Sequence, residues 1–225
     1  MKKRIPPHSF SITAFTLVEL LTVIAIIAIL MSILFPVIAA VKENARKVQA
    51  KNDVMGIVTA VKAYNTEYGK YPTVDTSKSS GGGNDDEEAA VGDPAADIDI
   101  KNNALFNTLR ALPEGLNEKH KYNPRRVVFF EGKSVSNPVQ PRAGFLEKGA
   151  EDVKGCLYDP WGRQYNVVMD SNYDNMIKVK DYYSDVKEDE SPRVGVAAFS
   201  LGTDNKLGTN GDKKIQDADD QVSWK

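Results

Sequence analysis

The chain has 225 residues, and its 29 basic and 31 acidic side chains give a formal net charge of −2. Without the three basic residues at positions 2–4 the balance is 26 basic against 31 acidic, about −5, which disfavours nucleic acid as a main partner because phosphate binding needs a basic face. The single cysteine, Cys156, excludes an intramolecular disulfide and is expected to be a small buried apolar residue.

The first predicted element is an apolar helix over residues 14–41. The stretch from Leu20 to Val41 has no charged residue, and about 20 apolar residues span the hydrocarbon core of a bilayer as a helix. The basic residues 2–4 lie on its N-terminal side, so this leader is expected to stay in the cytoplasm while the rest is exported. A cleaved secretory signal is the main alternative, but this run is longer than such a signal and no A-x-A-like site follows it.

One carboxylate, Glu19, lies near the start of the apolar run. An uncompensated carboxylate in hydrocarbon costs about 2.5 kcal/mol or more. A plain membrane anchor has no need of it, so another interaction is expected to offset this cost. The alternative is that Glu19 lies at the membrane interface and reaches water from a plain anchor.

The helical pattern continues out of the apolar run as far as Tyr68. Apolar residues recur there in two adjoining stripes, and the opposite face is charged. The heptad-spaced stripe is Val41, Val48 and Met55, and the adjoining stripe is Val54, Val58 and Val61. Pro36 removes a backbone hydrogen bond and predicts a kink or local melting, while Gly69 and Pro72 predict the end of the helix.

Shorter elements are predicted after this helix. Residues 73–100 contain the sequence SSGGGNDDEEAA and are expected to form a flexible acidic linker. A short amphipathic helix is predicted over 103–112, ended by Pro113. Four β-rich runs separated by turn residues then predict strands, at 126–131, 164–169, 176–179 and 194–200.

The predicted fold is therefore α+β. A long helix over residues 15–72, with a transmembrane half at 15–41, is expected to pack on a small C-terminal antiparallel sheet. The sheet belongs to a globular part over residues 101–225, which is expected to lie outside the membrane.

Two sets of motifs carry a family resemblance. The sequence FTLVELL at residues 15–21, preceded by a short basic leader, resembles the class III signal of type IV pilins and pseudopilins, as do Pro36 and the helix ending YGKYP at 68–72. Further along, DPWGRQY at 159–165 and FSLGTD at 199–204 resemble the major pseudopilin of type II secretion systems. Residues 73–151 match that family poorly. The resemblance implies a pilin-like fold.

The resemblance also implies a processing step. A prepilin peptidase would remove the leader over residues 1–14 by cutting between Ala14 and Phe15, and Phe15 would be N-methylated; the family usually has glycine where this chain has Ala14. Cleavage would expose a cationic amino group at Phe15, which the Glu19 carboxylate of a neighbouring subunit can meet. Such a pair is tolerable in hydrocarbon where an isolated carboxylate is not, so it favours assembly and sets the axial register.

A second constellation is the acidic loop over residues 200–224. Clustered carboxylates and turn carbonyls suit Ca²⁺, which takes six to eight oxygen ligands. The loop is not an EF-hand, because Lys206 and Ile215 occupy the third and twelfth positions counted from Asp204. By resemblance, one Ca²⁺ would be held by the carbonyls of Leu201 and Lys206 and by the side chains of Asp204, Asp219 and Asp220. Because the loop is longer than usual, Asp212 or Asp217 could replace one of these; the alternative is an acidic surface loop without metal.

A third candidate is the turn over residues 170–175, where oxygen-bearing side chains occupy positions one, three and five of a calcium loop and Asp181 falls at the twelfth. Asn175 replaces the expected glycine and no flanking helices are evident, so a hairpin turn held by Asx hydrogen bonds is favoured. The sequence DPWG at 159–162 is expected to be a rigid turn that docks an aromatic side chain on the long helix.

No catalytic set is found. His8 lies in the leader and His120 is alone in the sequence, so neither a histidine-based triad nor a multi-histidine metal site is available, and the chain is not expected to be an enzyme.

The resemblance implies a structural subunit of a periplasmic pseudopilus in a type II secretion system, a homo-oligomeric helical filament that drives protein export. The implied partners are the prepilin peptidase, minor pseudopilins and an inner-membrane assembly platform. The chain would cross the bacterial inner membrane once, with its C-terminal part in the periplasm. Two alternatives are a surface type IV pilin for adhesion, motility or DNA uptake, and a lone membrane-anchored binding domain.

Overall fold

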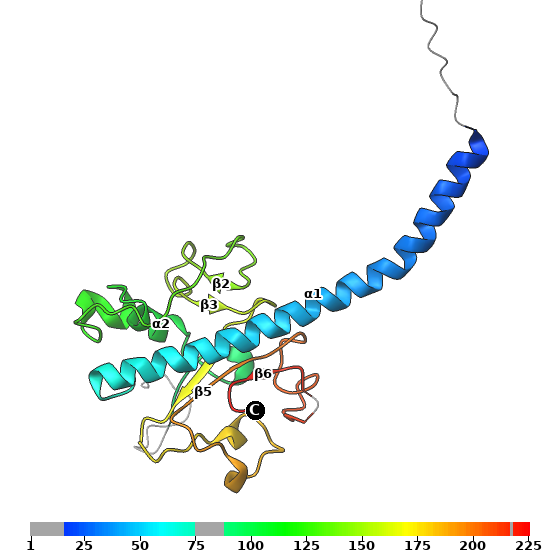
Figure 1. Cartoon of the computed structure of the whole chain (residues 1–225). Helices are drawn as coiled ribbons and strands as arrows, with labels where there is room; N and C mark the ends of the chain where they lie inside the picture. Colours follow the sequence, from blue (N-terminus) through cyan, green and yellow to red (C-terminus); the bar gives the residue numbers. More distant parts are fainter. Residues whose placement is uncertain (1–15, 75–87, 217) are drawn as a thin grey trace, which may run out of the picture. The chain divides into compact units, whose positions relative to one another are not determined.

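A computed structural model describes residues 16–74, 88–216 and 218–225 (Figure 1). The chain forms two compact units, Met1–Asn44 and Ala45–Lys225. Helix α1 (Leu17–Tyr68) provides the regular structure of the first unit and continues into the second.

The N-terminal part of α1 is apolar and exposed. The helix is long and apolar enough to cross a membrane, and none of its most apolar segment is buried. It continues through Pro36, so of the two predicted outcomes, a kink or local melting, the melting is wrong: one lost backbone hydrogen bond is tolerated within a helix of 52 residues. The helix ends at Tyr68, where the Gly69 N–H donates to the Asn65 carbonyl and Gly69 adopts a left-handed φ of 70°.

Only one of the two predicted apolar stripes of α1 packs into the protein. Val54, Val58 and Val61 are buried, together with Ala50, Ile57, Ala60 and Tyr64. Val41, Val48 and Met55 are 61%, 61% and 46% exposed, so their heptad spacing did not indicate burial. With 3.6 residues per turn, the two stripes lie on different sides of the helix, and only one faces the core.

The main sheet has four antiparallel strands in the order β1-β4-β5-β6. Its strands are β1 (Ala89–Val91), β4 (Asn166–Met169), β5 (Val196–Ser200) and β6 (Gln221–Val222). The register pairs Val167 with both Val91 and Ala198, and Phe199 with Val222. A second sheet pairs β2 (Gly144–Phe145) with β3 (Leu157–Tyr158).

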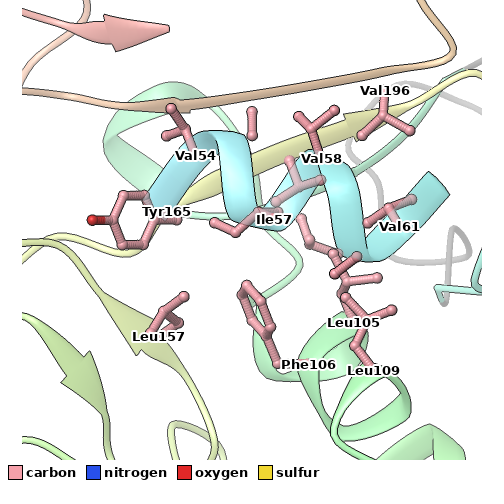
Figure 2. Close-up of a cluster of buried hydrophobic side chains, with 14 of the residues drawn as sticks. Val54, Ile57, Val58, Val61, Leu105, Phe106, Leu109, Leu157, Tyr165 and Val196 are labelled. Carbon is pink, nitrogen blue, oxygen red and sulfur yellow. The ribbon is translucent and has the colours of Figure 1, made fainter. Parts of the chain in front are cut away.

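Both faces of the main sheet are covered. Val167, Met169 and Ala198 belong to a cluster with the buried stripe of α1 and with helix α2 (Asn103–Leu109). Figure 2 shows the α1 side chains Val54, Ile57, Val58 and Val61 together with Leu105, Phe106 and Leu109 of α2, and with Leu157, Tyr165 and Val196. The alternate strand residues Val168, Ala197 and Phe199 belong to a second cluster, formed with Ile177, Val179, Tyr183, Leu201 and Leu207. Each fully buried side chain of this kind stabilises the fold by about 1.5–3 kcal/mol.

The sheet and the short helix confirm the α+β class, with differences in detail. Strands β4 and β5 lie within the predicted runs, but 126–131 is not a strand: the N–H groups of Phe129 and Phe130 both donate to the Leu109 carbonyl at the end of α2. Residues 176–179 lead into the 3₁₀ helix η4 (Val179–Asp181) instead of forming a strand.

The predicted linker is also shorter than expected. Strand β1 pairs with β4, and Asp93 caps the 3₁₀ helix η2 (Pro94–Ala96), so this end of the range 73–100 is ordered. Residues 75–87, which hold most of the SSGGGNDDEEAA sequence, lie outside the described residues. Two further 3₁₀ helices are η3 (Gly115–His120) and η5 (Glu188–Glu190).

Candidate functional site

Glu19 closes a reciprocal hydrogen-bonded cap with Thr16 at the start of α1. The Thr16 N–H and hydroxyl donate to Glu19 Oε2 at 2.9 and 2.7 Å, and the Glu19 N–H donates to Thr16 Oγ1 at 3.2 Å. This is a capping box, in which two otherwise unpaired donors at a helix start are satisfied. The spacing T-x-x-E at 16–19 predicts this cap, although Thr16 was not among the expected site residues.

The cap satisfies hydrogen bonds but supplies no positive charge. Within the described part of the chain, no ion pair reaches Glu19, and the side chain is exposed like its apolar neighbours from Leu17 to Val41. Ala14 and Phe15, the predicted processing junction, lie outside the described residues. Among the described residues, the Glu19 carboxylate is therefore held by hydrogen bonds alone, without an opposite charge.

The acidic loop over residues 200–224 is closed by its own aspartates. Asp219 Oδ2 accepts from the N–H groups of Thr203 and Asp204. Asp204 in turn accepts from the Lys206 N–H at 2.9 Å and from the Asn210 N–H. Two predicted metal ligands therefore hold the backbone of the loop in place.

Asp220 is the most unusual of these carboxylates. Its Oδ2 accepts from the Tyr183 hydroxyl and the Gly208 N–H, both at 2.8 Å, while its buried Oδ1 has no hydrogen-bond partner among the described residues. The pKa of Asp220 is raised to about 7, mainly by burial and also by the nearby charges of Asp219 and Asp204, while the hydrogen bonds from Gly208 and Tyr183 oppose the shift. An orphaned carboxylate oxygen with two more carboxylates nearby fits a hard cation in its donor chemistry.

The other predicted ligands are less closely grouped. Leu201 is buried and Lys206 is exposed on a turn, and Asp212 Oδ1 accepts from the N–H groups of Thr209 and Lys214. Asp217 lies outside the described residues. Across the ranges that the structure describes, no three carboxylate, histidine or cysteine side chains are arranged to hold a metal ion.

Aromatic packing and α1 anchor the C-terminal end of the acidic loop. Trp224 contacts Tyr183 and Phe199 edge-on, with ring centroids 6.2 and 6.0 Å apart. The Lys51 ammonium donates to the carbonyls of Val222 and Lys225, each at 2.7 Å. The loop therefore begins at the end of β5, and its C-terminal end is held on the sheet and on α1.

The DPWG motif forms the expected tight turn. Asp159 Oδ1 accepts from the N–H groups of Trp161, Gly162 and Arg163 at 2.7–2.9 Å, and Trp161 packs in the cluster that contains the α1 stripe. Burial raises the pKa of Asp159, although the hydrogen bond from Ser200 and those from the turn oppose this shift.

The turn over residues 170–175 uses its oxygen atoms internally. Asp170 accepts from the N–H groups of Asp174 and Asn175, and Asp174 accepts from the Met176 N–H. Tyr173 and Asn175 adopt left-handed φ values of 61° and 62°. These Asx hydrogen bonds are those of a polar turn.

Cys156 is buried as expected, and burial raises the pKa of its thiol to about 11. A thiol in this state is a poor nucleophile and a packing residue.

Comparisons of the chain with protein-family models, with curated proteins and with solved structures found no match.

Proposed function

We propose that this chain is a structural subunit of a periplasmic pseudopilus of a type II secretion system, and that it polymerises through α1 to drive protein export. It would be inserted once in the bacterial inner membrane and processed by a prepilin peptidase. Minor pseudopilins and an inner-membrane assembly platform would be its other partners.

The observation that carries the proposal is the exposed apolar part of α1 with one capped carboxylate at its start. Large apolar side chains from Leu17 to Val41 are uncovered, and such a surface needs lipid or protein around it. In the membrane, lipid would cover it before assembly. In a filament, the same surface on other copies would cover it.

Glu19 would set the axial offset between neighbouring subunits. The capping box with Thr16 fixes the carboxylate at the helix start, but a fixed and unpaired charge in hydrocarbon remains unfavourable. The amino group that cleavage would create at Phe15 of a neighbour supplies the missing cation. Pairing would then be available only at one axial offset between neighbouring helices.

The acidic loop is proposed to hold one Ca²⁺ through the carbonyls of Leu201 and Lys206 and the carboxylates of Asp204, Asp219 and Asp220. The orphaned Oδ1 of Asp220 supports this choice. Bound calcium would neutralise the carboxylates and order the loop in a domain whose one cysteine, Cys156, has no second cysteine with which to form a disulfide.

Native N-terminal mass and assembly test the proposal together. We expect the protein purified from its own cells to lack residues 1–14, to carry one methyl group and to form cross-linkable polymers. Deletion of the chain should abolish exoprotein secretion and leave surface fibres unchanged. An uncut leader would support a lone anchored domain instead, and loss of surface fibres with normal secretion would support a surface pilin.

A further inference from the structure

A basic loop lies beside the C-terminal end of α1. Residues 119–126, here named the basic loop, have the sequence KHKYNPRR, with four lysine or arginine residues and no acidic residue. The loop follows α2 in the green part of the chain in Figure 1. The protein as a whole has a net negative charge, whereas this segment is positively charged.

Buried hydrogen bonds hold the basic loop in one conformation. Asn117 Oδ1 accepts from the N–H groups of Tyr122 and Asn123, and Asn123 Nδ2 donates to the Thr108 and Val127 carbonyls. From α1, the Tyr64 hydroxyl donates to the Tyr122 carbonyl and the Tyr68 hydroxyl donates to Asn123 Oδ1. Because both asparagines are fully buried, the loop presents its side chains from a preorganised backbone.

Three of its cations have no carboxylate partner. Arg125 pairs with Glu67, but within the described residues the exposed side chains of Lys119, Lys121 and Arg126 form no ion pair. The chain continues directly into Val127 and Val128, which are 36% and 49% exposed. Lys119, Lys121 and Arg126 thus lie on a fixed backbone next to two partly exposed valines, an arrangement that suits a protein surface of opposite charge.

The complementary charge lies on another segment of the same chain. Residues 181–190, here named the acidic segment, have five acidic residues and one lysine. Asp181, Asp189 and Glu190 are exposed, and Asp185 fixes the segment by accepting from the N–H groups of Ile215 and Gln216.

The two segments lie on opposite faces of the main sheet. The basic loop is bonded to α1, which packs on one face with Val167 and Ala198. The acidic segment packs through Tyr183 into the cluster on the other face, with Phe199. They are therefore placed to contact different molecules, and a contact between unlike surfaces of identical chains repeats head to tail and builds an open helical polymer.

We propose that the basic loop of one copy docks on the acidic segment of the next copy. This inference rests on the proposed filament function and adds to it a second, polar contact outside the membrane. The charges would steer approaching subunits and exclude contacts between like surfaces, while Val127 and Val128 would be covered in the contact.

Disulfide trapping in the full chain tests this contact, because Cys156 is buried and will not interfere. The variant K121C/E190C carries one new thiol on each segment, and under oxidation we expect a ladder of covalent multimers. Either single variant should stop at dimers at most. The matched control K121C/K148C has two new thiols on basic positions and should give no ladder. A ladder from the control equal to that from K121C/E190C would overturn the inference.

Charge reversal gives an independent readout. K119E/K121E/R126E should reduce polymer formation about tenfold, and adding D181K/D189K/E190K to the same chain should restore it, because the swapped charges are again complementary. If the reversed variant polymerises normally but loses binding to vesicles of anionic lipid, the loop binds lipid and the inference fails. If filaments form through α1 without the ladder, the inference fails and the proposed function stands; if no polymer forms in the unmodified protein, the proposed function fails.

Discussion

The Ser200 hydroxyl donates a hydrogen bond of 2.6 Å to the carboxylate of Asp159, and both side chains are fully buried. This contact joins the end of β5 to the tight turn at residues 159–162. The DPWG motif at 159–162 and the FSLG motif at 199–202 are thus bonded directly. Their shared role in this chain is to connect the sheet to the turn that carries Trp161.

Removing this hydroxyl tests that role. We expect Ser200→Ala to lower the free energy of unfolding by about 1–3 kcal/mol, because one buried oxygen of Asp159 loses its donor. Urea unfolding measures the change. Ser184→Ala is the matched control, since Ser184 is exposed and its loss should change stability by less than about 0.5 kcal/mol. Equal effects of the two substitutions would contradict the assignment.

The capping box and the charge of Glu19 can be separated by substitution. Glu19→Gln keeps an acceptor for the Thr16 donors but removes the charge, whereas Thr16→Ala keeps the charge and removes the hydroxyl. If the charge sets subunit register, Glu19→Gln should abolish polymer formation and Thr16→Ala should weaken it only modestly, as measured by cross-linking in cells. The reverse order would assign Glu19 to helix capping alone.

Calcium should stabilise the acidic loop. We expect a chelator to lower the melting temperature of the full chain in detergent. Calcium at about 100 times its dissociation constant should raise the free energy of unfolding by about 2.7 kcal/mol. Asp219→Ala should abolish the response, while Asp174→Ala in the 170–175 turn should leave it intact. A melting temperature that ignores both calcium and chelator would exclude the calcium proposal.

Glu88 should make stability depend on pH. The pKa of Glu88 is raised to about 7, mainly by burial and also by the nearby charge of Asp181, although the Lys178 N–H opposes the shift by donating to the carboxylate. The folded state therefore holds a proton that the unfolded chain releases near pH 4.5. Stability from this group is fully present below that pH and is lost as pH rises toward about 7. Glu88→Gln should flatten this part of the stability profile, and Glu114→Gln, at a partly exposed ion pair with Lys154, is the control.

Substitutions in the buried stripe and in the exposed stripe of α1 should destabilise the protein by very different amounts. Ile57→Ala should cost about 2–5 kcal/mol of unfolding free energy, because the side chain is fully buried between α2 and the sheet. Met55→Ala should cost less than about 0.5 kcal/mol in the isolated chain, because Met55 is exposed. Denaturant unfolding of both variants measures the difference. Comparable losses would mean that Met55 is covered.

Much of the fold follows from local patterns in the sequence. The long apolar run, the left-handed Gly69 and the consecutive valines at 167–168 are local signals, and the helix and strand β4 are found where they predict. The run at 126–131 has the same β-branched and aromatic composition, but within the described ranges it pairs with no strand. Strand formation needs a partner, and sequence composition does not supply one.

The pairing of β1 and the surroundings of Asp220 could not be predicted from local sequence patterns, because they depend on contacts between residues far apart in the chain. Strand β1 has only three residues beside an acidic stretch, and its pairing with β4 joins residues far apart in the chain. The orphaned oxygen of Asp220 likewise depends on Tyr183 and Gly208 reaching the same carboxylate. The Thr16 to Glu19 cap is different, because its four-residue signature was readable from the sequence alone.

The outermost strands of the main sheet are β1 and β6, of three and two residues. Edges this short offer few free backbone groups to an incoming strand, and both faces of the sheet are already covered. The domain is thereby protected from cross-β aggregation even when many copies are crowded together. We therefore expect a regular polymer of this chain to grow through its helix and its loops, with the main sheet remaining within its own subunit.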